Sequence, residues 1–347
     1  MIDLRSDTKT KPTHGMRQAM ANAEVGDEQR LEDPTTVELE RRVAELLGQE
    51  EAVFLPTATM SNQIALSSLG EPGTELIVEE TAHIMIAELG GAARFSGLVT
   101  RPIRGERGTF TPEQVRERFS PGDEHHVPRT SALALEDTHN TGGGRVWPHA
   151  QLLEVVETGR ELGLRLHLDG ARLLNASVAS GVPAAELGRH FDTVTLCLSK
   201  GLGCPLGALI AGSAELMRRA RRQKHAFGGA MRQSGIVAAA GLYALDHHAE
   251  RLADDHVHAR RLANGLAERG VPVDPDLVET NFVQVDVSPL GLAVPDALER
   301  LHEAGVGLSS TMRPGVLRAV THLDLTENDI DQAIERIPVA LGVLARA

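Results

Sequence analysis

Short runs of wholly apolar residues, separated by segments with helical periodicity, recur along most of the chain and constrain its fold more than any other feature. A strand that is apolar along its whole length has both faces buried, as happens in parallel sheets covered by crossover helices. The pattern therefore predicts an α/β domain with a mainly parallel sheet and helices on both faces. The expected strands are 52–55, 76–78, 133–135, 164–168, 194–198 and 208–211.

The segments between these runs carry helix signals. Asp33 is a good capping residue, Pro34 suits the first helical position, and Gly48 suits the position after the last turn. These residues predict a helix that begins at Pro34 and ends before Gly48. Periodic apolar residues predict further helices over 60–69, 148–161 and 214–224, and the pattern from 232 to 270 is helical throughout.

Strand-like runs return after Gly270, at 271–273, 282–287 and 316–320. Helical patterns follow near 295–304 and after Thr326. This mixture predicts a small α+β domain packed on the larger α/β domain. We expect residues 1–247 to form the large domain and residues 248–347 the small C-terminal domain.

Composition excludes several classes of partner. The formal net charge of −13 opposes binding to nucleic acid or to an anionic membrane. The longest charge-free run, 52–70, is interrupted by proline and amide residues, so it does not predict a transmembrane helix, and residues 1–12 lack the apolar core of a secretion signal. Cys197 and Cys204 are too few for a disulfide framework, which favours buried thiols in the cytoplasm.

Polar residues that directly follow the predicted strands supply the candidate chemistry. Asp169 follows 164–168, Lys200 comes two residues after 194–198, His83 comes shortly after 76–78, and a predicted helix start at 57–61 follows 52–55. Ligands of parallel sheets bind at the carboxyl ends of the strands. We therefore expect an acid, a lysine, an imidazole and a helix N-terminus to meet at one edge of the sheet.

Pyridoxal phosphate requires this combination of groups. A lysine amine forms an imine with its aldehyde, and a carboxylate keeps its pyridine nitrogen protonated so that the ring can accept electrons. A helix N-terminus binds its phosphate, and a flat side chain stacks on its ring. We assign these four roles to Lys200, Asp169, residues 57–61 and His83.

Each residue alone has a plainer interpretation. A lysine after a strand is usually solvated, Asp169 can cap a helix that begins at Ala171, and His83 can be an ordinary surface or core histidine. The glycines at 201, 203 and 207 suggest a dinucleotide loop, but their spacing is wrong and a strand follows them. Four histidines between 247 and 258 lie among charged residues without metal-ligand spacing, so we predict no metal site.

Several motifs, in their order along the chain, resemble those of the low-specificity L-threonine aldolases. They are MIDLRSDT at 1–8, EDP at 32–34, HLDGAR at 167–172, LSKGLG at 198–203, GGAMRQ at 228–233 and VTHLD at 320–324. The resemblance covers essentially the whole chain. It implies a fold-type I large domain, similar to that of aspartate aminotransferase, with a seven-stranded sheet. It also implies a homotetramer, built as a dimer of dimers, with active sites at subunit interfaces.

The resemblance implies a role for each matched residue. Catalysis falls to Lys200, His83 and His126, the last near the substrate's β-hydroxyl. The residues implied to bind the cofactor are Lys200, Asp169, His83, Ala58, Thr59, Arg172 and Arg232, with Arg232 reaching the phosphate from a neighbouring subunit. The residues implied to bind the substrate carboxylate are Ser6, Arg172 and Arg318, with Ser6 in an N-terminal substrate-binding segment of the large domain.

The implied reaction is retro-aldol cleavage of L-threonine, L-allo-threonine or a related β-hydroxy-α-amino acid such as phenylserine, giving glycine and an aldehyde. β-Elimination or racemisation on the same scaffold is the main alternative, and a non-catalytic cofactor-binding protein is a weaker one. The chain departs from the family pattern at Arg30-Leu31, where Tyr-Gly is usual, at Ala58, where glycine is usual, and at Asp137, where asparagine is common.

Overall fold

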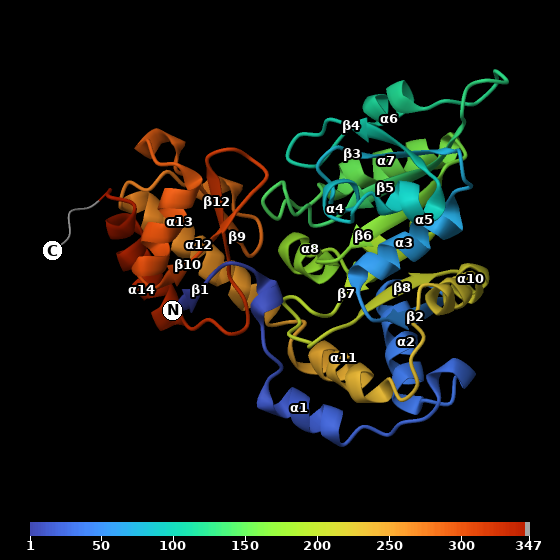
Figure 1. Ribbon diagram of the computed structural model, residues 1–347, viewed down its shortest axis with the longest axis horizontal. Helices are drawn as coiled ribbons and strands as arrows, with labels where there is room; N and C mark the ends of the chain where they lie inside the picture. The colour runs from blue at the N-terminus through green and yellow to red at the C-terminus, as the bar shows by residue number, and fades with distance from the viewer. Residues whose placement is uncertain (344–347) are drawn as a thin grey trace.

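The computed structural model describes residues 1–343. Its larger body contains a seven-stranded sheet with the order β2-β8-β7-β6-β5-β3-β4 (Figure 1). β8 runs antiparallel to both of its neighbours, and the remaining pairs are parallel. The strands are β2 (Glu51–Leu55), β3 (Glu75–Glu79), β4 (Val99–Ile103), β5 (Thr130–Glu136), β6 (Arg165–Gly170), β7 (Thr193–Cys197) and β8 (Ala208–Gly212). The predicted mainly parallel, seven-stranded sheet is confirmed.

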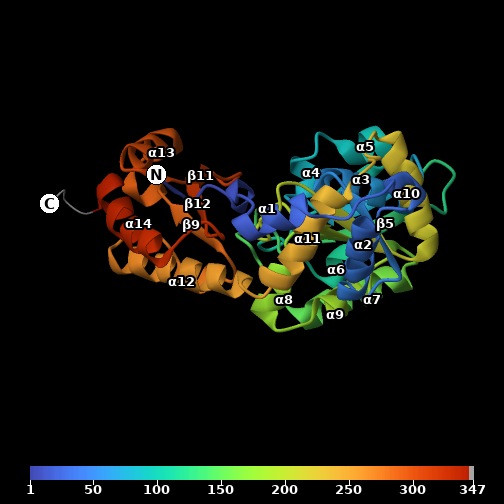
Figure 2. The same cartoon turned by 90° about the horizontal axis from the view of Figure 1, so that it is seen from below.

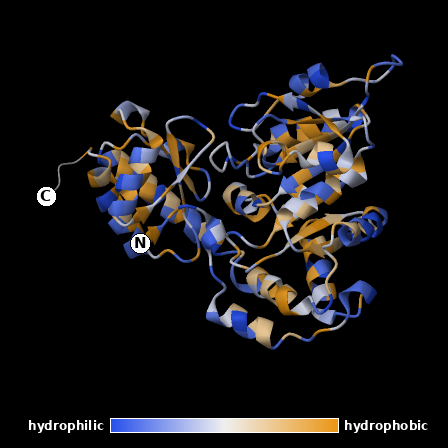
Figure 3. Ribbon diagram, in the orientation of Figure 1, coloured by the Kyte–Doolittle hydropathy of each residue, from blue (hydrophilic) through white to orange (hydrophobic). Residues whose placement is uncertain are grey.

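Helices cover both faces of this sheet. Because alternate side chains of a strand point to opposite faces, Ala52 and Phe54 enter one hydrophobic core while Val53 and Leu55 enter another. One face packs against α3 (Ala58–Leu69), α5 (Gly91–Ser96) and α10 (Ala214–Ala226). The other packs against α2 (Pro34–Leu46), α6 (Pro112–Arg118), α7 (His149–Glu161), α8 (Leu173–Ser180), α9 (Ala184–Gly188) and α11 (Gly235–His247). Figure 3 shows hydrophobic strands at the centre of the larger body, with hydrophilic residues frequent in several of the surrounding helices.

Local capping residues define where the helices near the site begin. The Asp33 side chain accepts a hydrogen bond from the Thr36 N–H (2.9 Å) ahead of α2, as the sequence predicts. Thr57 caps α3 in the same way, through the Met60 N–H (3.1 Å). α3 therefore begins directly after β2, with its N-terminus at the carboxyl edge of the sheet.

The smaller body has its own core. β11 (Ser309–Ser310), β12 (Val316–Val320) and β9 (Phe282–Asp286) form an antiparallel sheet. Its helices are α12 (Leu252–Glu268), α13 (Val294–Glu303) and α14 (Glu327–Ala340). β1 (Ile2–Asp3) pairs in parallel with β10 (Val306–Gly307), and Ile2 and Leu4 are buried in this second core. The first residues of the chain thus pack within the smaller body, beside elements from the other end of the sequence (Figure 1).

The chain then enters the larger body. α1 (His14–Ala21) packs on α11, and the loop from α11 leads to α12, which extends along the smaller body (Figure 2). The predicted domain boundary between residues 247 and 248 falls in this loop, and it stays a prediction.

Among the described residues, four strands were not predicted from the sequence, namely β4 and the two-residue strands β1, β10 and β11, and one predicted strand is absent. β4 lies at an edge of the sheet, half-exposed and containing Pro102, so it lacks the apolar run that signals a buried strand. Residues 271–273 were expected to form a strand but lie outside the strands, because Pro272 has no N–H to donate. No helix of the described chain is long and apolar enough to cross a membrane.

Candidate active site

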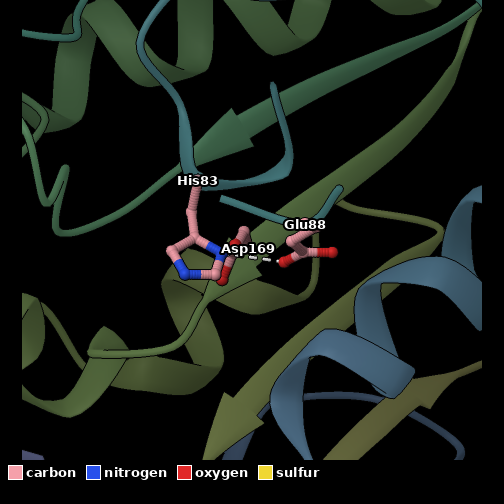
Figure 4. Close-up of side chains that lie close together, drawn as sticks. All are labelled: His83, Glu88 and Asp169. Atoms are coloured by element: carbon pink, nitrogen blue, oxygen red, sulfur yellow. Dashed lines mark hydrogen bonds and ion pairs between the residues drawn. The ribbon is translucent and has the colours of Figure 1, made fainter. Parts of the chain in front are cut away.

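The carboxyl edge of the sheet brings three predicted residues together. Asp169 lies near the end of β6, His83 begins the short helix α4 (His83–Ile86) after β3, and Lys200 follows β7. A ring nitrogen of His83 and carboxylate oxygens of Asp169 and Glu88 lie within 4.8 Å of one another (Figure 4). The ammonium of Lys200 is near enough to lower the pKa of His83 electrostatically. The lysine, the acid and the imidazole therefore share one site.

Asp169 is held from two directions. Its Oδ2 accepts a hydrogen bond from Asn62 Nδ2 in α3 (2.8 Å), and its Oδ1 accepts one from the Ala171 N–H (3.1 Å). The second bond is the local capping contact that the plainer interpretation of Asp169 expects. The bond from Asn62 holds the buried carboxylate at the centre of the site. Asp169 therefore has a contact there in addition to local capping.

The His167 ring contacts the Asn62 side chain and fixes the orientation of its amide. Its Nε2 lies 3.2 Å from Asn62 Oδ1, and its Nδ1 lies 2.9 Å from Thr193 Oγ1. Complete burial lowers the pKa of His167 to about 4, so the ring is neutral at physiological pH. A neutral ring satisfies these contacts by donating from Nε2 to the Asn62 oxygen, which leaves the Asn62 amide hydrogens for carboxylates.

Two arginines from different bodies converge beside Lys200. Arg172, just after β6, donates from Nε and Nη2 to Asp7, with both distances 2.7 Å. Arg318, on β12, donates from Nη1 to Asn140 Oδ1 (2.9 Å). Both guanidinium groups lie over the Phe282 ring, at 4.9 Å and 5.2 Å from its centroid.

The charges of this cluster do not balance. Burial alone would raise the pKa of Asp7, but the adjacent Arg172 cation lowers it to about 2. Burial, together with the charge of Arg172, lowers the pKa of Arg318 to about 10, at which it is still a cation at neutral pH. Arg318 Nε is buried and has no hydrogen-bond partner within residues 1–343. One carboxylate thus faces two cations, and the excess positive charge suits a bound carboxylate.

Asp7 accepts from Nε and from one hydrogen of Nη2 of Arg172. Nη1 and the second hydrogen of Nη2 remain as donors for a ligand. Ser6 immediately precedes Asp7 and caps a short 3-10 helix, with its Oγ accepting from the Thr8 N–H (3.2 Å). The chain therefore places all three predicted carboxylate-binding residues near one another.

The start of α3 offers an anion site. The N–H groups of Ala58 and Thr59 belong to its first turn, where a helix leaves backbone donors without intrahelical partners. Ala58 replaces the usual glycine, but it lies in ordinary helical conformation and its backbone N–H does not depend on the side chain.

Two predicted site residues, Arg232 and His126, contact residues of their own chain that lie outside this site. Arg232 is 61% exposed and forms an ion pair with Asp27 (3.0 Å). His126 is 63% exposed and lies 3.6 Å from Glu124, on the loop that projects before β5 (Figure 1).

Sequence reasoning missed several residues of the site, and their signals differ. Glu136 ends a wholly buried strand, so the rule that found Asp169 could have found it; its Oε2 accepts from the His83 N–H (2.6 Å). Asp7 lies inside the motif at 1–8, but it does not follow a predicted strand. Glu88 follows the short apolar run 84–87, but most of that run lies in the helix α4 and not in a strand, so the rule of strand ends does not select it.

Comparisons with known proteins place the chain in a family. A family model described as beta-eliminating lyase matches residues 3–288. The low specificity L-threonine aldolase of Escherichia coli (strain K12) is 42% identical over 331 residues, which cover 95% of this chain and 96% of that protein. The chain belongs to the low-specificity L-threonine aldolase family. This confirms the resemblance that the motifs carry.

Solved structures agree on the fold. A threonine aldolase of Leishmania major superposes with a TM-score of 0.84 at 19% identity, covering 98% of this chain and 99% of that one. A mutant of the aspartate aminotransferase of Thermus thermophilus gives a TM-score of 0.70 at 19% identity, covering 99% and 96%. The predicted fold-type I architecture is therefore confirmed.

Proposed function

We propose that this chain is a pyridoxal-phosphate-dependent aldolase that cleaves L-threonine, L-allo-threonine or a related β-hydroxy-α-amino acid such as phenylserine to glycine and an aldehyde. The observation that carries the proposal is the convergence of Lys200, Asp169 and His83 at one sheet edge, beside the surplus positive charge of Arg172 and Arg318. The sequence identity to a named L-threonine aldolase over nearly the whole chain supports it.

The donor set fits the cofactor. Asp169 offers a buried carboxylate for the pyridine nitrogen, the His83 ring offers a flat face, and the first turn of α3 offers backbone N–H groups for the phosphate. Lys200 is the amine that would hold the aldehyde carbon. When bound, pyridoxal phosphate supplies a conjugated ring that accepts the electron pair released at the substrate's Cα.

The chain's own residues orient the substrate and move its proton. Arg172 and Arg318 bind the carboxylate, and a charge-assisted clamp of this kind fixes the rotation about the bond from Cα to the amino nitrogen. Ser6 contributes a hydroxyl to the same group. His83 or His126 accepts the proton of the β-hydroxyl as the Cα–Cβ bond breaks. The Lys200 amine would hold the cofactor when no substrate is bound.

The test is to incubate the purified, cofactor-loaded protein with L-threonine, L-allo-threonine and L-phenylserine, and to assay aldehyde, glycine, ammonia and 2-oxo acid. We expect an aldehyde and glycine in equal amounts from at least one substrate, and none from a Lys200→Ala variant. No aldehyde from any of the three would rule out the aldolase. A 2-oxo acid with ammonia, 2-oxobutanoate from either threonine or phenylpyruvate from phenylserine, would instead favour β-elimination, the reaction in the family model's description.

The assembly and the domain division are part of the proposal. We infer a homotetramer in which Arg232 of one chain reaches the phosphate bound by its neighbour, since its exposed side chain has no partner at its own chain's site. We propose a large cofactor-binding domain of residues 1–247 and a small domain of residues 248–347, with the first residues of the chain packed against the core of the small domain. The two buried, free thiols of Cys197 and Cys204 support the cytoplasm as the compartment.

A further inference from the structure

We propose that Glu88 is a positioning residue that holds the His83 ring through Nδ1 and leaves Nε2 to exchange the substrate's proton. The kinetic part of this inference rests on the proposed function. The structural part concerns one carboxylate–imidazole pair and can be tested without any substrate.

Glu88 is built into the site as a hydrogen-bond acceptor. Its side chain is 0% exposed. Three side chains donate to it: Asn62 Nδ2 to Oε1 (2.8 Å), Gln63 Nε2 to Oε2 (2.5 Å) and His83 Nδ1 to Oε1 (2.8 Å). A buried carboxylate is costly unless its oxygens are paired in this way, so the neighbouring donors are matched to it.

The contact with Glu88 decides which ring nitrogen carries the hydrogen. A carboxylate only accepts, so Nδ1 of His83 must donate to it (Figure 4). In the neutral ring Nε2 then keeps its lone pair and can accept a proton, and after accepting it can return it. The same Oε1 is linked through the Asn62 amide to Oδ2 of Asp169. Glu88 thus ties the imidazole to the carboxylate proposed for the pyridine nitrogen.

The backbone makes a left-handed turn directly after Glu88, whose side chain is buried. Leu89 and Gly90 are consecutive left-handed residues, with φ of +55° and +67°. Leu89 is 93% exposed, beside a neighbour whose side chain is fully enclosed. A left-handed leucine costs about 1 kcal/mol, so the turn is retained against a local penalty. A Cβ at Gly91 would lie 2.4 Å from Gln63 Cδ, so α5 packs closely on a donor to Glu88.

Charged groups around His83 act in both directions. The hydrogen bond that His83 donates to Glu88 is the largest influence and raises the pKa of His83, while burial opposes it. The Asp169 carboxylate also raises this pKa, and the Lys200 cation lowers it. Glu136 accepts the backbone N–H of His83 rather than its ring. Removing the Glu88 charge should therefore make the imidazolium of His83 less stable.

The test compares Glu88→Gln with Glu80→Gln, a matched control at an exposed carboxylate that pairs with Arg104. The cofactor-loaded protein without substrate is incubated in deuterated buffer across pH, and exchange at the His83 Cε1 position is followed by mass spectrometry. We expect His83 to titrate above about 6.5, its unperturbed pKa, in the unmodified protein and in the control, and lower in Glu88→Gln. Titration of the unmodified protein at or below that value overturns the proposal even if Glu88→Gln fails to fold.

Kinetics provide the second readout. With L-threonine, Glu88→Gln should lower kcat by about 10²-fold with little change in KM, because general-base catalysis is impaired while carboxylate binding is not. The acidic limb of the kcat–pH profile should move to lower pH. An unchanged pH profile, or equal loss in the control, overturns the positioning role. Absence of aldolase activity in the unmodified protein would instead count against the proposed function and leave the exchange result to stand.

Discussion

Asp137 shows how one buried carboxyl can make stability depend on pH. Its Oδ1 accepts from the Trp147 N–H at 3.3 Å, while its Oδ2 has no hydrogen-bond partner within residues 1–343. Burial raises its pKa to about 8, and the nearby charge of Glu279 raises it as well. At neutral pH the group is therefore mostly a neutral acid, which resembles in shape the asparagine common at this position.

Replacing Asp137 by asparagine should remove this pH dependence. A carboxyl whose folded pKa exceeds its unfolded value of 3.8 costs stability as pH rises from that value through the folded one. Between pH 5.5 and 8 the unmodified protein should lose on the order of 3 kcal/mol more unfolding free energy than Asp137→Asn. Urea unfolding at both pH values measures the difference. Parallel losses in the two proteins would show that Asp137 ionises normally.

Arg318 offers a second prediction at the scale of one residue. Lysine in its place keeps the positive charge but loses the planar fork that can grip a carboxylate. We expect Arg318→Lys to lower kcat/KM for L-threonine by about 10- to 100-fold, mainly through KM, since a charge-assisted hydrogen bond is worth roughly 1.5–3 kcal/mol. Steady-state kinetics measure this loss, and the visible absorbance of the bound cofactor should be unchanged. An unaltered KM would place the carboxylate elsewhere.

Among the secondary-structure elements, the turn before α2 contains the clearest local conflict. Leu31 has φ of +59° and ends a 3-10 helix (Glu28–Arg30), at the position where the family usually has glycine. A left-handed conformation is strained for leucine and free for glycine. The side chain is exposed, so little packing compensates for the strain.

Glycine at this turn should therefore stabilise the protein. We expect Leu31→Gly to increase the unfolding free energy by about 0.5–1 kcal/mol, the relief of strain being partly offset by the greater entropy of glycine in the unfolded chain. Leu31→Ala keeps the Cβ and serves as the control, which should gain nothing. Thermal unfolding monitored by circular dichroism compares the three proteins. An equal gain from alanine would attribute the effect to the lost apolar surface instead of the backbone.

The elements also show what the sequence could predict. Buried strands such as β2 can be predicted because both of their faces are apolar. The helix α2 can be predicted because Asp33 and Pro34 mark its start. β4 could not be recognised, since an exposed edge strand has no such pattern. At the site, Lys200 and Asp169 followed from the ends of strands. Glu88 did not, because its place depends on a left-handed turn and on donors from α3.

At the scale of the whole molecule, the carboxylate site is assembled from both bodies. Arg172 follows β6 of the larger body, whereas Arg318 and Phe282 lie on strands of the smaller one. Asp7 joins them, because the N-terminal strand β1 belongs to the smaller core while the following residues reach Arg172. Any change in the relative position of the two bodies would separate the two cations, so substrate binding depends on how the bodies are joined.

The proposed assembly extends this dependence to a second chain. If Arg232 serves a neighbour's site, then Lys200→Ala and Arg232→Ala chains, each inactive alone, should complement one another. A mixed pair contains one site with both native residues and one with neither. Random mixing should therefore restore about a quarter of the sites of the unmodified protein, given two-fold symmetric pairs. Co-expression of the two variants in equal amounts, without separation of the assemblies, provides this mixture.

The same mixture discriminates against a role for Arg232 within its own chain. In that case every site lacks either the native lysine or the native arginine, whatever the subunit composition, and mixing restores nothing. His126 can be examined in the same way, because its exposed loop leaves it without a contact to Lys200 or Asp169 of its own chain. Recovery with Arg232→Ala but not with His126→Ala would mean that the neighbouring chain supplies the phosphate ligand alone, and that His126 reaches its own site by movement of the loop.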